Sequence, residues 1–334
     1  MRARVNLLTR HAYPLYTQHI GAQFSEKVEL VENGDGGDWD LAIVFEGMSV
    51  PAALTVREGG LVFVSGEPPE IGIYPPGFLA QFDRVYSAKP GRHPDAVRIQ
   101  HFNNWHFGYN GSEQSYRYDH ATLRALPIPE KTRDISVVTS NLSYLPNHFK
   151  RLRLIERFRQ RFGERIDFFG RPHRFVEYKD EALLPYRFHL CFENSGVPGL
   201  WTEKIADPIL GYAVPIYAGA PDIEKFFPGA VIRLDLDDPA AAEAVVANVL
   251  DHAEEIYQAR LPALIEARRR LIEEHDLTAL ILAELGRVQD APPRTVRLAP
   301  PQAFADFNWR ELGSRMHRRM RTLATRAAYR LRGW

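Results

Sequence analysis

The sequence predicts an α/β fold in which parallel sheets form two domains. Short apolar, β-rich runs alternate with amphipathic helical segments along most of the chain, a pattern typical of parallel strands joined by helical crossovers. The chain has 334 residues, more than one hydrophobic core usually supports. A proline-broken polar stretch, Leu126–Lys131, separates two such alternating regions. We therefore expect two α/β domains facing a cleft.

The individual elements follow from local pattern. In the first region we expect strands at Arg4–Leu8, Val28–Val31, Leu41–Phe45, Leu61–Ser65, Arg84–Tyr86 and Val97–Gln100. In the second we expect strands at Ile135–Thr139, Ile166–Phe169, Phe188–Phe192, Val214–Tyr217 and Val231–Leu234. Helices are expected over Phe149–Phe162, from about Thr202, and across Ala240–Glu274. Four prolines within Ala291–Pro301 predict a linker. The expected domains are therefore residues 1–128 and 129–295, followed by a linker and tail at 296–334.

The composition excludes several classes of protein. Its one cysteine, Cys191, rules out a disulfide framework and a cysteine-built zinc site, and its apolar neighbours predict a buried, inert thiol. No apolar run reaches the ~18 residues that a spanning helix needs, and residues 1–11 lack the apolar core of a signal peptide. We therefore expect a soluble protein in a reducing, cytoplasmic compartment.

Charge is unevenly distributed although 42 basic residues balance 42 acidic ones. Residues 309–334 hold eight arginines and one acid, which leaves 34 basic and 41 acidic residues before them. Apolar side chains recur there every three or four positions, from Trp309 to Trp334. This pattern predicts a basic amphipathic helix lying on an anionic membrane, which would make the protein peripheral on the cytoplasmic face.

Two other interpretations of the tail stay open. The same helix would suit docking on the acidic body or one seam of a homodimer. Specific binding to nucleic acid is not expected, because no recognition motif accompanies the arginines.

The stretch 187–219 carries most of the functional signal. A buried strand, Phe188–Phe192, ends in Glu193-Asn194, and a loop then leads to Thr202-Glu203-Lys204. Ligands of open α/β sheets bind beyond the carboxyl ends of strands, where a helix N-terminus attracts anions. Thr202 is a suitable N-cap, whereas Lys204 opposes the helix dipole unless a phosphate lies nearby. A solvated Glu–Lys pair is the alternative.

These residues resemble the donor-binding motif of the inverting α1,3/4-fucosyltransferases, family ten of the glycosyltransferases. The resemblance runs through several blocks in order: Ser140-Asn141, Asp167–Arg171, Tyr186–Ser195, Thr202–Ile205, Ala213–Gly219 and Phe226–Ile232. It is good over about residues 135–240 and loose in the first domain. The resemblance implies a GT-B arrangement of two Rossmann-like domains. It also implies GDP-fucose bound by the C-terminal domain and an acceptor site shaped by the N-terminal one.

The resemblance also assigns roles to individual residues. It implies that the diphosphate is held by Lys204 and by an arginine that follows the Ser140-Asn141 block, with Arg151 the preferred candidate and Arg153 the second. Asn194 and Glu203 match family positions that contact the donor ribose and nucleoside, and Glu193 is a further donor-binding candidate.

Two departures from the family pattern concern the donor. Leu200-Trp201 replaces the family's aromatic–aliphatic pair before the Thr-Glu-Lys block, so a different nucleotide sugar stays open. Pro208 falls inside the helix that Thr202 begins and is expected to kink it.

Inverting transfer needs a carboxylate to accept the proton of the attacking hydroxyl. Glu67 follows the apolar strand Leu61–Ser65 in a Gly66-Glu67 pair, which resembles the position of the family's base. Glu46, which follows Phe45 at another strand end, is the second candidate. An acidic run, Asp235–Asp238, is explained equally well by a turn before Pro239, so no metal or other cofactor is expected.

The sequence thus predicts a fucosyltransferase that acts on a surface glycan resembling lipopolysaccharide, or on its lipid-linked precursor. A transferase for another nucleotide sugar and a degenerate glycan- or membrane-binding protein are the alternatives. The aromatic stretch His101–Phe107 suits either stacking on acceptor sugars or packing inside the protein.

Overall fold

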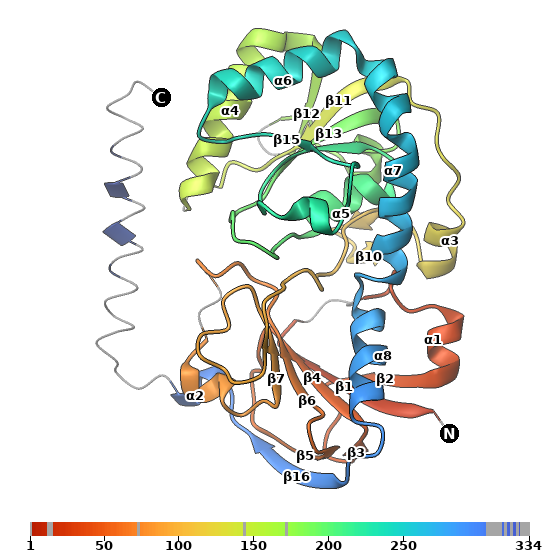
Figure 1. The fold of residues 1–334 in the computed structure, drawn as a ribbon, viewed down its shortest axis with the longest axis vertical. Coiled ribbons are helices and arrows are strands. Elements are labelled where there is room, and N and C mark those ends of the chain that lie inside the picture. Colours follow the sequence, from red (N-terminus) through yellow and green to blue (C-terminus); the bar gives the residue numbers. More distant parts are fainter. Residues whose placement is uncertain are drawn as a thin grey trace. The chain divides into compact units, whose positions relative to one another are not determined.

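The fold is described from a computed structural model of the chain. It describes residues 2–11, 16–71, 74–142, 145–170 and 173–304, together with six isolated positions between 316 and 327. The chain divides into two compact units (Figure 1). Of the residues described up to Phe304, unit 1 combines those up to Asn104 with those from Glu273 onward, and unit 2 is Trp105–Ile272. The expected domain boundaries near residues 128 and 295 stay predictions.

Unit 1 contains a six-stranded parallel sheet in the order β2-β1-β4-β6-β7-β8. Its strands are β1 (Ala3–Thr9), β2 (Val28–Glu32), β4 (Leu41–Phe45), β6 (Leu61–Val64), β7 (Arg84–Tyr86) and β8 (Ala96–Val97). Its helices are α1 (Ala22–Lys27), α2 (Pro76–Leu79) and α8 (Leu277–Arg287). Strands β4 and β6 are buried along their whole length, because both faces of a parallel sheet are covered.

A second sheet in unit 1 corrects one expectation. Strand β5 (Ala52–Arg57) pairs in parallel with β3 (Asp38–Trp39) and antiparallel with β16 (Pro293–Leu298). Residues 293–298 were expected to be linker but form this edge strand. The prolines lie at its start and beyond its end, where no ladder donor is needed. A short 3-10 turn, Pro301–Phe304, follows.

Unit 2 is built on a five-stranded parallel sheet in the order β12-β11-β13-β14-β15 (Figure 1). The strands are β11 (Arg133–Val138), β12 (Ile166–Phe169), β13 (Tyr186–Phe192), β14 (Val214–Ala218) and β15 (Ile232–Arg233). The helices are α3 (His120–Arg124), α4 (Pro146–Phe162), α5 (Glu203–Leu210), α6 (Pro239–Asp251) and α7 (Ala253–Glu273). A small hairpin pairs β9 (Tyr109–Asn110) with β10 (Ser115–Tyr116). These parallel sheets confirm the predicted α/β class.

The aromatic stretch around residue 105 belongs to the two hydrophobic cores. Phe102 packs in the core of unit 1, whereas Trp105 and Phe107 are buried in that of unit 2. These three rings therefore pack inside the protein, as one of the two interpretations predicted, and do not stack on a sugar. The lone thiol of Cys191 is also buried, as predicted, and burial raises its pKa well above the ordinary value.

The expected amphipathic tail lies almost entirely outside the described residues. Three large apolar side chains are described there, Met316, Met320 and Leu323, and all three are exposed. Within the described part of the chain, no helix has the length and hydropathy that crossing a bilayer requires.

Candidate donor-binding site

The site in unit 2 forms where strand β13 meets the first turn of α5. Thr202 is the N-cap of α5, as predicted, and its hydroxyl accepts a hydrogen bond from the backbone N–H of Lys204. The carboxylate of Glu193, which follows β13, accepts from the Thr202 backbone N–H at 2.8 Å and from its hydroxyl at 2.9 Å. These bonds tie the end of the strand to the start of the helix.

Glu193 is a buried acid. Burial raises its pKa to about 7, although the positive charge of Lys204 acts in the opposite direction. Because Thr202 donates two hydrogen bonds to it, this side chain holds the loop between β13 and α5 in place. Asn194, the next residue, accepts instead from His148 on α4, with 2.9 Å between Asn194 Oδ1 and His148 Nε2.

Lys204 and Glu203 form an ion pair in the first turn of α5, with 2.8 Å between Nζ and Oε1. Both side chains keep part of their surface exposed. Burial favours the neutral form of each, but mutual attraction dominates: the pKa of Lys204 is raised and that of Glu203 is lowered. A cation is therefore fixed at the N-terminus of a helix, an arrangement suited to a phosphate.

Arg151 on α4 contributes a second cation. Its guanidinium donates to the carbonyls of Ser140 and Leu142, which lie in the loop after β11. A cavity of about 580 Å³ has Arg151, Glu203 and Lys204 in its lining. Arg153 is half-buried on the same helix but does not line this cavity. The structure thus brings Arg151, rather than Arg153, to the same cavity as Lys204.

The same cavity contains residues that the sequence analysis missed. Lys179 bonds Asp207 with 2.5 Å between Nζ and Oδ2, and the other oxygen of Asp207 accepts from the backbone N–H of His106 at 2.9 Å. Asp207 is fully buried, and Lys179 and His106 line the cavity. One signal was present: Asp207 lies four residues after Glu203 and so shares its helix face. Pro208 lies within α5, which continues to Leu210.

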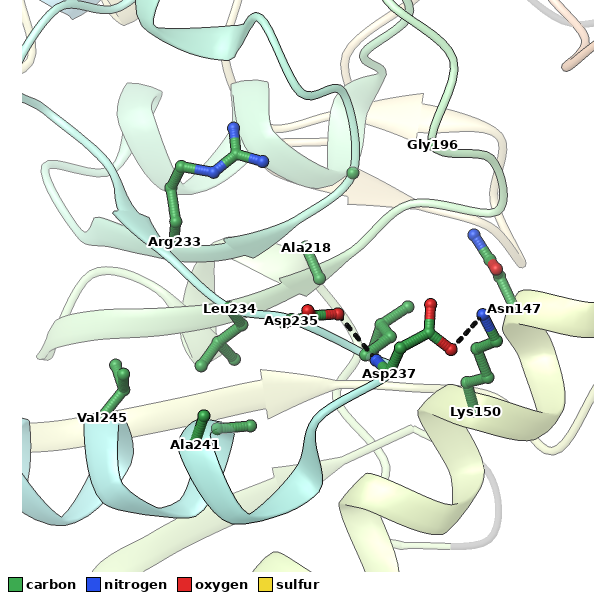
Figure 2. A pocket seen from close by; sticks show the side chains of 13 residues that line it. Asn147, Lys150, Gly196, Ala218, Arg233, Leu234, Asp235, Asp237, Ala241 and Val245 are labelled. Carbon is green, nitrogen blue, oxygen red and sulfur yellow. Dashed lines mark hydrogen bonds and ion pairs between the residues drawn. The ribbon is translucent and has the colours of Figure 1, made fainter.

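A second cavity, of about 670 Å³, opens at the carboxyl ends of β14 and β15 (Figure 2). Its wall includes Gly196, from the loop after the Glu193-Asn194 pair, and Lys150 of α4. The ammonium of Lys150 lies 2.5 Å from the carboxylate of Asp237. Asp235 accepts from the Asp237 backbone N–H, and Asp238 caps α6. The turn interpretation of this acidic run is thus confirmed.

The two predicted carboxylates of the first domain lie in unit 1, at neighbouring strand ends. Glu67 is half-buried in the loop after β6, where Gln100 and Ser65 donate to its backbone carbonyl. Glu46 directly follows β4, and its backbone N–H donates to the carbonyl of Val64 in β6. Among the described residues, no group of three or more His, Cys, Asp or Glu side chains has an arrangement that would hold a metal ion.

Comparison with known proteins locates the similarity in unit 2. Residues 128–259 match the family model described as "Glycosyltransferase family 10 (fucosyltransferase) C-term". This stretch contains all of the predicted donor residues and, apart from His106, the residues that line the two cavities. The predicted resemblance to the family is confirmed for this part of the chain.

Two curated relatives match short segments. An α-(1,3)-fucosyltransferase of Helicobacter pylori is 46% identical over 52 residues, which are 16% of this chain and 11% of that protein. A putative fucosyltransferase-like protein of Arabidopsis thaliana is 38% identical over 69 residues, or 20% of this chain and 14% of that protein. The matched segments therefore span less than a sixth of either relative.

A solved structure extends the similarity of fold to both units. A crystal structure of an α1,3-fucosyltransferase aligns with a TM-score of 0.52 and 18% identity, over 86% of this chain and 90% of that chain. This alignment confirms the GT-B-like fold of paired α/β units.

Proposed function

We propose that the protein is an inverting glycosyltransferase that moves fucose from GDP-fucose to a hydroxyl group of a surface glycan. The observation that carries this proposal is the meeting of Lys204, Glu203 and Arg151 at one cavity beyond the strand ends. All three residues lie within the stretch that matches the fucosyltransferase family model. Two cations beside a helix N-terminus suit a diphosphate, and Glu203 suits the hydroxyl groups of a ribose.

In the proposed reaction, the acceptor oxygen attacks the anomeric carbon while the bond from that carbon to the β-phosphate oxygen breaks. The carboxylate of Glu67 takes the acceptor proton, and GDP leaves with the bonding electrons. Negative charge then grows on the leaving diphosphate, where Lys204, Arg151 and the first turn of α5 stabilise it more than in the ground state. The chemical step needs no metal ion in this scheme.

The cavity in Figure 2 is our candidate for the nucleobase. Its volume of about 670 Å³ suits a nucleoside, and the small apolar side chains of Ala218, Ala241 and Ala242 line it. The carboxylates of Asp235 and Asp237 are hydrogen-bond acceptors, which complement the N1–H and 2-amino donors of guanine. Inosine diphosphate, which lacks the 2-amino group, should therefore bind more weakly than GDP.

The membrane part of the proposal rests on residues 309–334. Their arginines and apolar period support binding to an anionic membrane surface, where a glycolipid acceptor would be available. Equal co-sedimentation of the full chain and a 1–308 truncation with phosphatidylglycerol vesicles would remove this part and leave the enzymatic proposal standing.

Two measurements test the function. The midpoint of thermal unfolding should rise with GDP and much less with UDP, ADP or CMP; a rise with UDP alone would favour a different donor. Glu67→Gln should retain this GDP effect while losing turnover, with the exposed Glu58→Gln as control. No effect of any nucleotide would favour a non-catalytic binding protein, and full turnover in Glu67→Gln would remove the base assignment.

A further inference from the structure

Glu46 has an unusual backbone at the carboxyl end of β4. Its φ is +57°, in the left-handed region that few residues other than glycine adopt. Such a conformation is strained, and residues held in it cluster at functional sites. The side chain that this backbone directs inward is a carboxylate with only 6% of its surface exposed.

The imidazole of His11 contacts this carboxylate and is the more exposed of the two side chains. His11 Nε2 is 2.7 Å from Glu46 Oε2, and the side chain of His11 remains 23% exposed. The guanidinium of Arg10 is 3.8 Å from the same oxygen. A buried carboxylate needs such partners, and in return it fixes which way the imidazole faces. The arrangement is that of a buried acid orienting a more exposed histidine.

Gly66 connects this pair with Glu67. A Cβ atom on Gly66 would lie 2.3 Å from Glu46 Oε1 and 2.8 Å from Asn103 Oδ1, so a larger residue does not fit there. The carboxylate of Glu46 therefore lies directly against the backbone that carries Glu67. Strands β4 and β6 are parallel neighbours, with Phe45 opposite Val64. His11 follows β1, the other parallel neighbour of β4, with Thr9 opposite Phe45. The carboxyl ends of β1, β4 and β6 thus present His11, Glu46 and Glu67 at one edge of the sheet.

We propose that His11, oriented by Glu46, binds a hydroxyl group of the acceptor sugar beside Glu67. An imidazole held by a carboxylate offers a fixed polar edge, and a sugar hydroxyl can donate to it or accept from it. The inference rests on the proposed function, because it takes Glu67 as the base. Glu46 is in this scheme a positioning residue, and its strained backbone is retained because it aims the carboxylate at His11.

The test separates acceptor binding from donor chemistry. The probe acceptor is N-acetyllactosamine with GDP-fucose, and hydrolysis of GDP-fucose without acceptor reports the donor site. His11→Ala should raise the acceptor KM about tenfold, the loss of one hydrogen bond, with hydrolysis and the GDP-induced thermal shift unchanged. His11→Gln, which keeps a donor for Glu46, guards against a folding defect, and His120→Ala on α3 is the control.

The possible outcomes distinguish a failure of this inference from a failure of the proposed function. An unchanged acceptor KM in both His11 variants would overturn the inference while leaving the proposed function intact. Equal losses of transfer and hydrolysis would assign His11 a structural role and overturn it too. Absence of both transfer and hydrolysis in the wild-type chain would overturn the proposed function, and the inference with it.

Discussion

The Glu193 carboxylate receives two hydrogen bonds from Thr202, one from its backbone N–H and one from its hydroxyl. The two residues are nine positions apart in sequence, and the intervening loop contributes Gly196 to the wall of the cavity in Figure 2. The bond thus fixes the first turn of α5, which carries Glu203 and Lys204, to the end of strand β13.

Removing this connection should destabilise unit 2. Thr202→Ala loses the helix cap and leaves a buried carboxylate with one fewer donor, so we expect a loss of about 1–2 kcal/mol in the free energy of unfolding. A double-mutant cycle with Glu193→Gln, measured by urea unfolding, should give a coupling energy above about 0.5 kcal/mol. Additive effects would show that the two side chains act independently.

Lys204 should control nucleotide affinity. Lys204→Met removes a cation from the first turn of α5, and a lost charged hydrogen bond of about 1.5–3 kcal/mol weakens binding roughly 10- to 100-fold. Calorimetric titration with GDP measures this loss. Lys225→Met, a change at a well-exposed lysine of the same unit, should bind as the wild-type protein does. Equal affinities of the two variants would remove Lys204 from the phosphate site.

His189 should make unit 2 sensitive to acid. It is buried, and its Nδ1–H donates to the Ser136 hydroxyl oxygen at 2.8 Å. Burial, with a smaller effect of Lys179, lowers its pKa from 6.5 to about 3. Between these values the unfolded chain binds a proton that the folded chain does not. The free energy of unfolding therefore falls as pH decreases, by up to about 1.4 kcal/mol per pH unit.

His189→Gln should flatten this dependence, which urea midpoints at pH 7 and pH 5 would reveal. His252→Gln, at an exposed position after α6, is the control and should keep the wild-type slope. If His189→Gln also kept that slope, another group would be responsible for the acid sensitivity.

Gly170 should tolerate no side chain. It lines the cavity that holds Arg151 and Lys204, its φ is +88°, and a Cβ atom there would lie 2.1 Å from the carbonyl oxygen of Thr139. Gly170→Ala should therefore lower the free energy of unfolding by more than about 2 kcal/mol, since both its own backbone and the segment after β11 that carries Thr139 must move. The midpoint of thermal unfolding measures this loss. Gly286→Ala, on the open surface of α8, should leave that midpoint unchanged or raise it.

The sequence predicted well those features that depend on local pattern. Strands β4 and β7 have the expected bounds, and Thr202 caps α5, because apolar runs and capping residues act over a few positions. Strand β16 was missed because its partner, β5, lies more than 230 residues earlier, and the flanking prolines indicated a linker. No local pattern signals such a pairing.

The same distinction applies to the site. Lys204 and Glu203 were found because they are adjacent in a recognisable block. The Lys179–Asp207 and His148–Asn194 contacts join residues 28 and 46 positions apart, and only the fold brings them together. Likewise, the left-handed backbone of Glu46 has no signature in its own sequence, although the next residue, Gly47, also has a positive φ.

The most direct measurement of the central claim is the mass of the product formed from GDP-fucose and a glycan acceptor. We expect the acceptor to gain one deoxyhexose with the wild-type protein, and to gain none with Glu67→Gln although that variant still binds GDP. Absence of any gain with the wild-type protein, together with no stabilisation by GDP, would contradict the account.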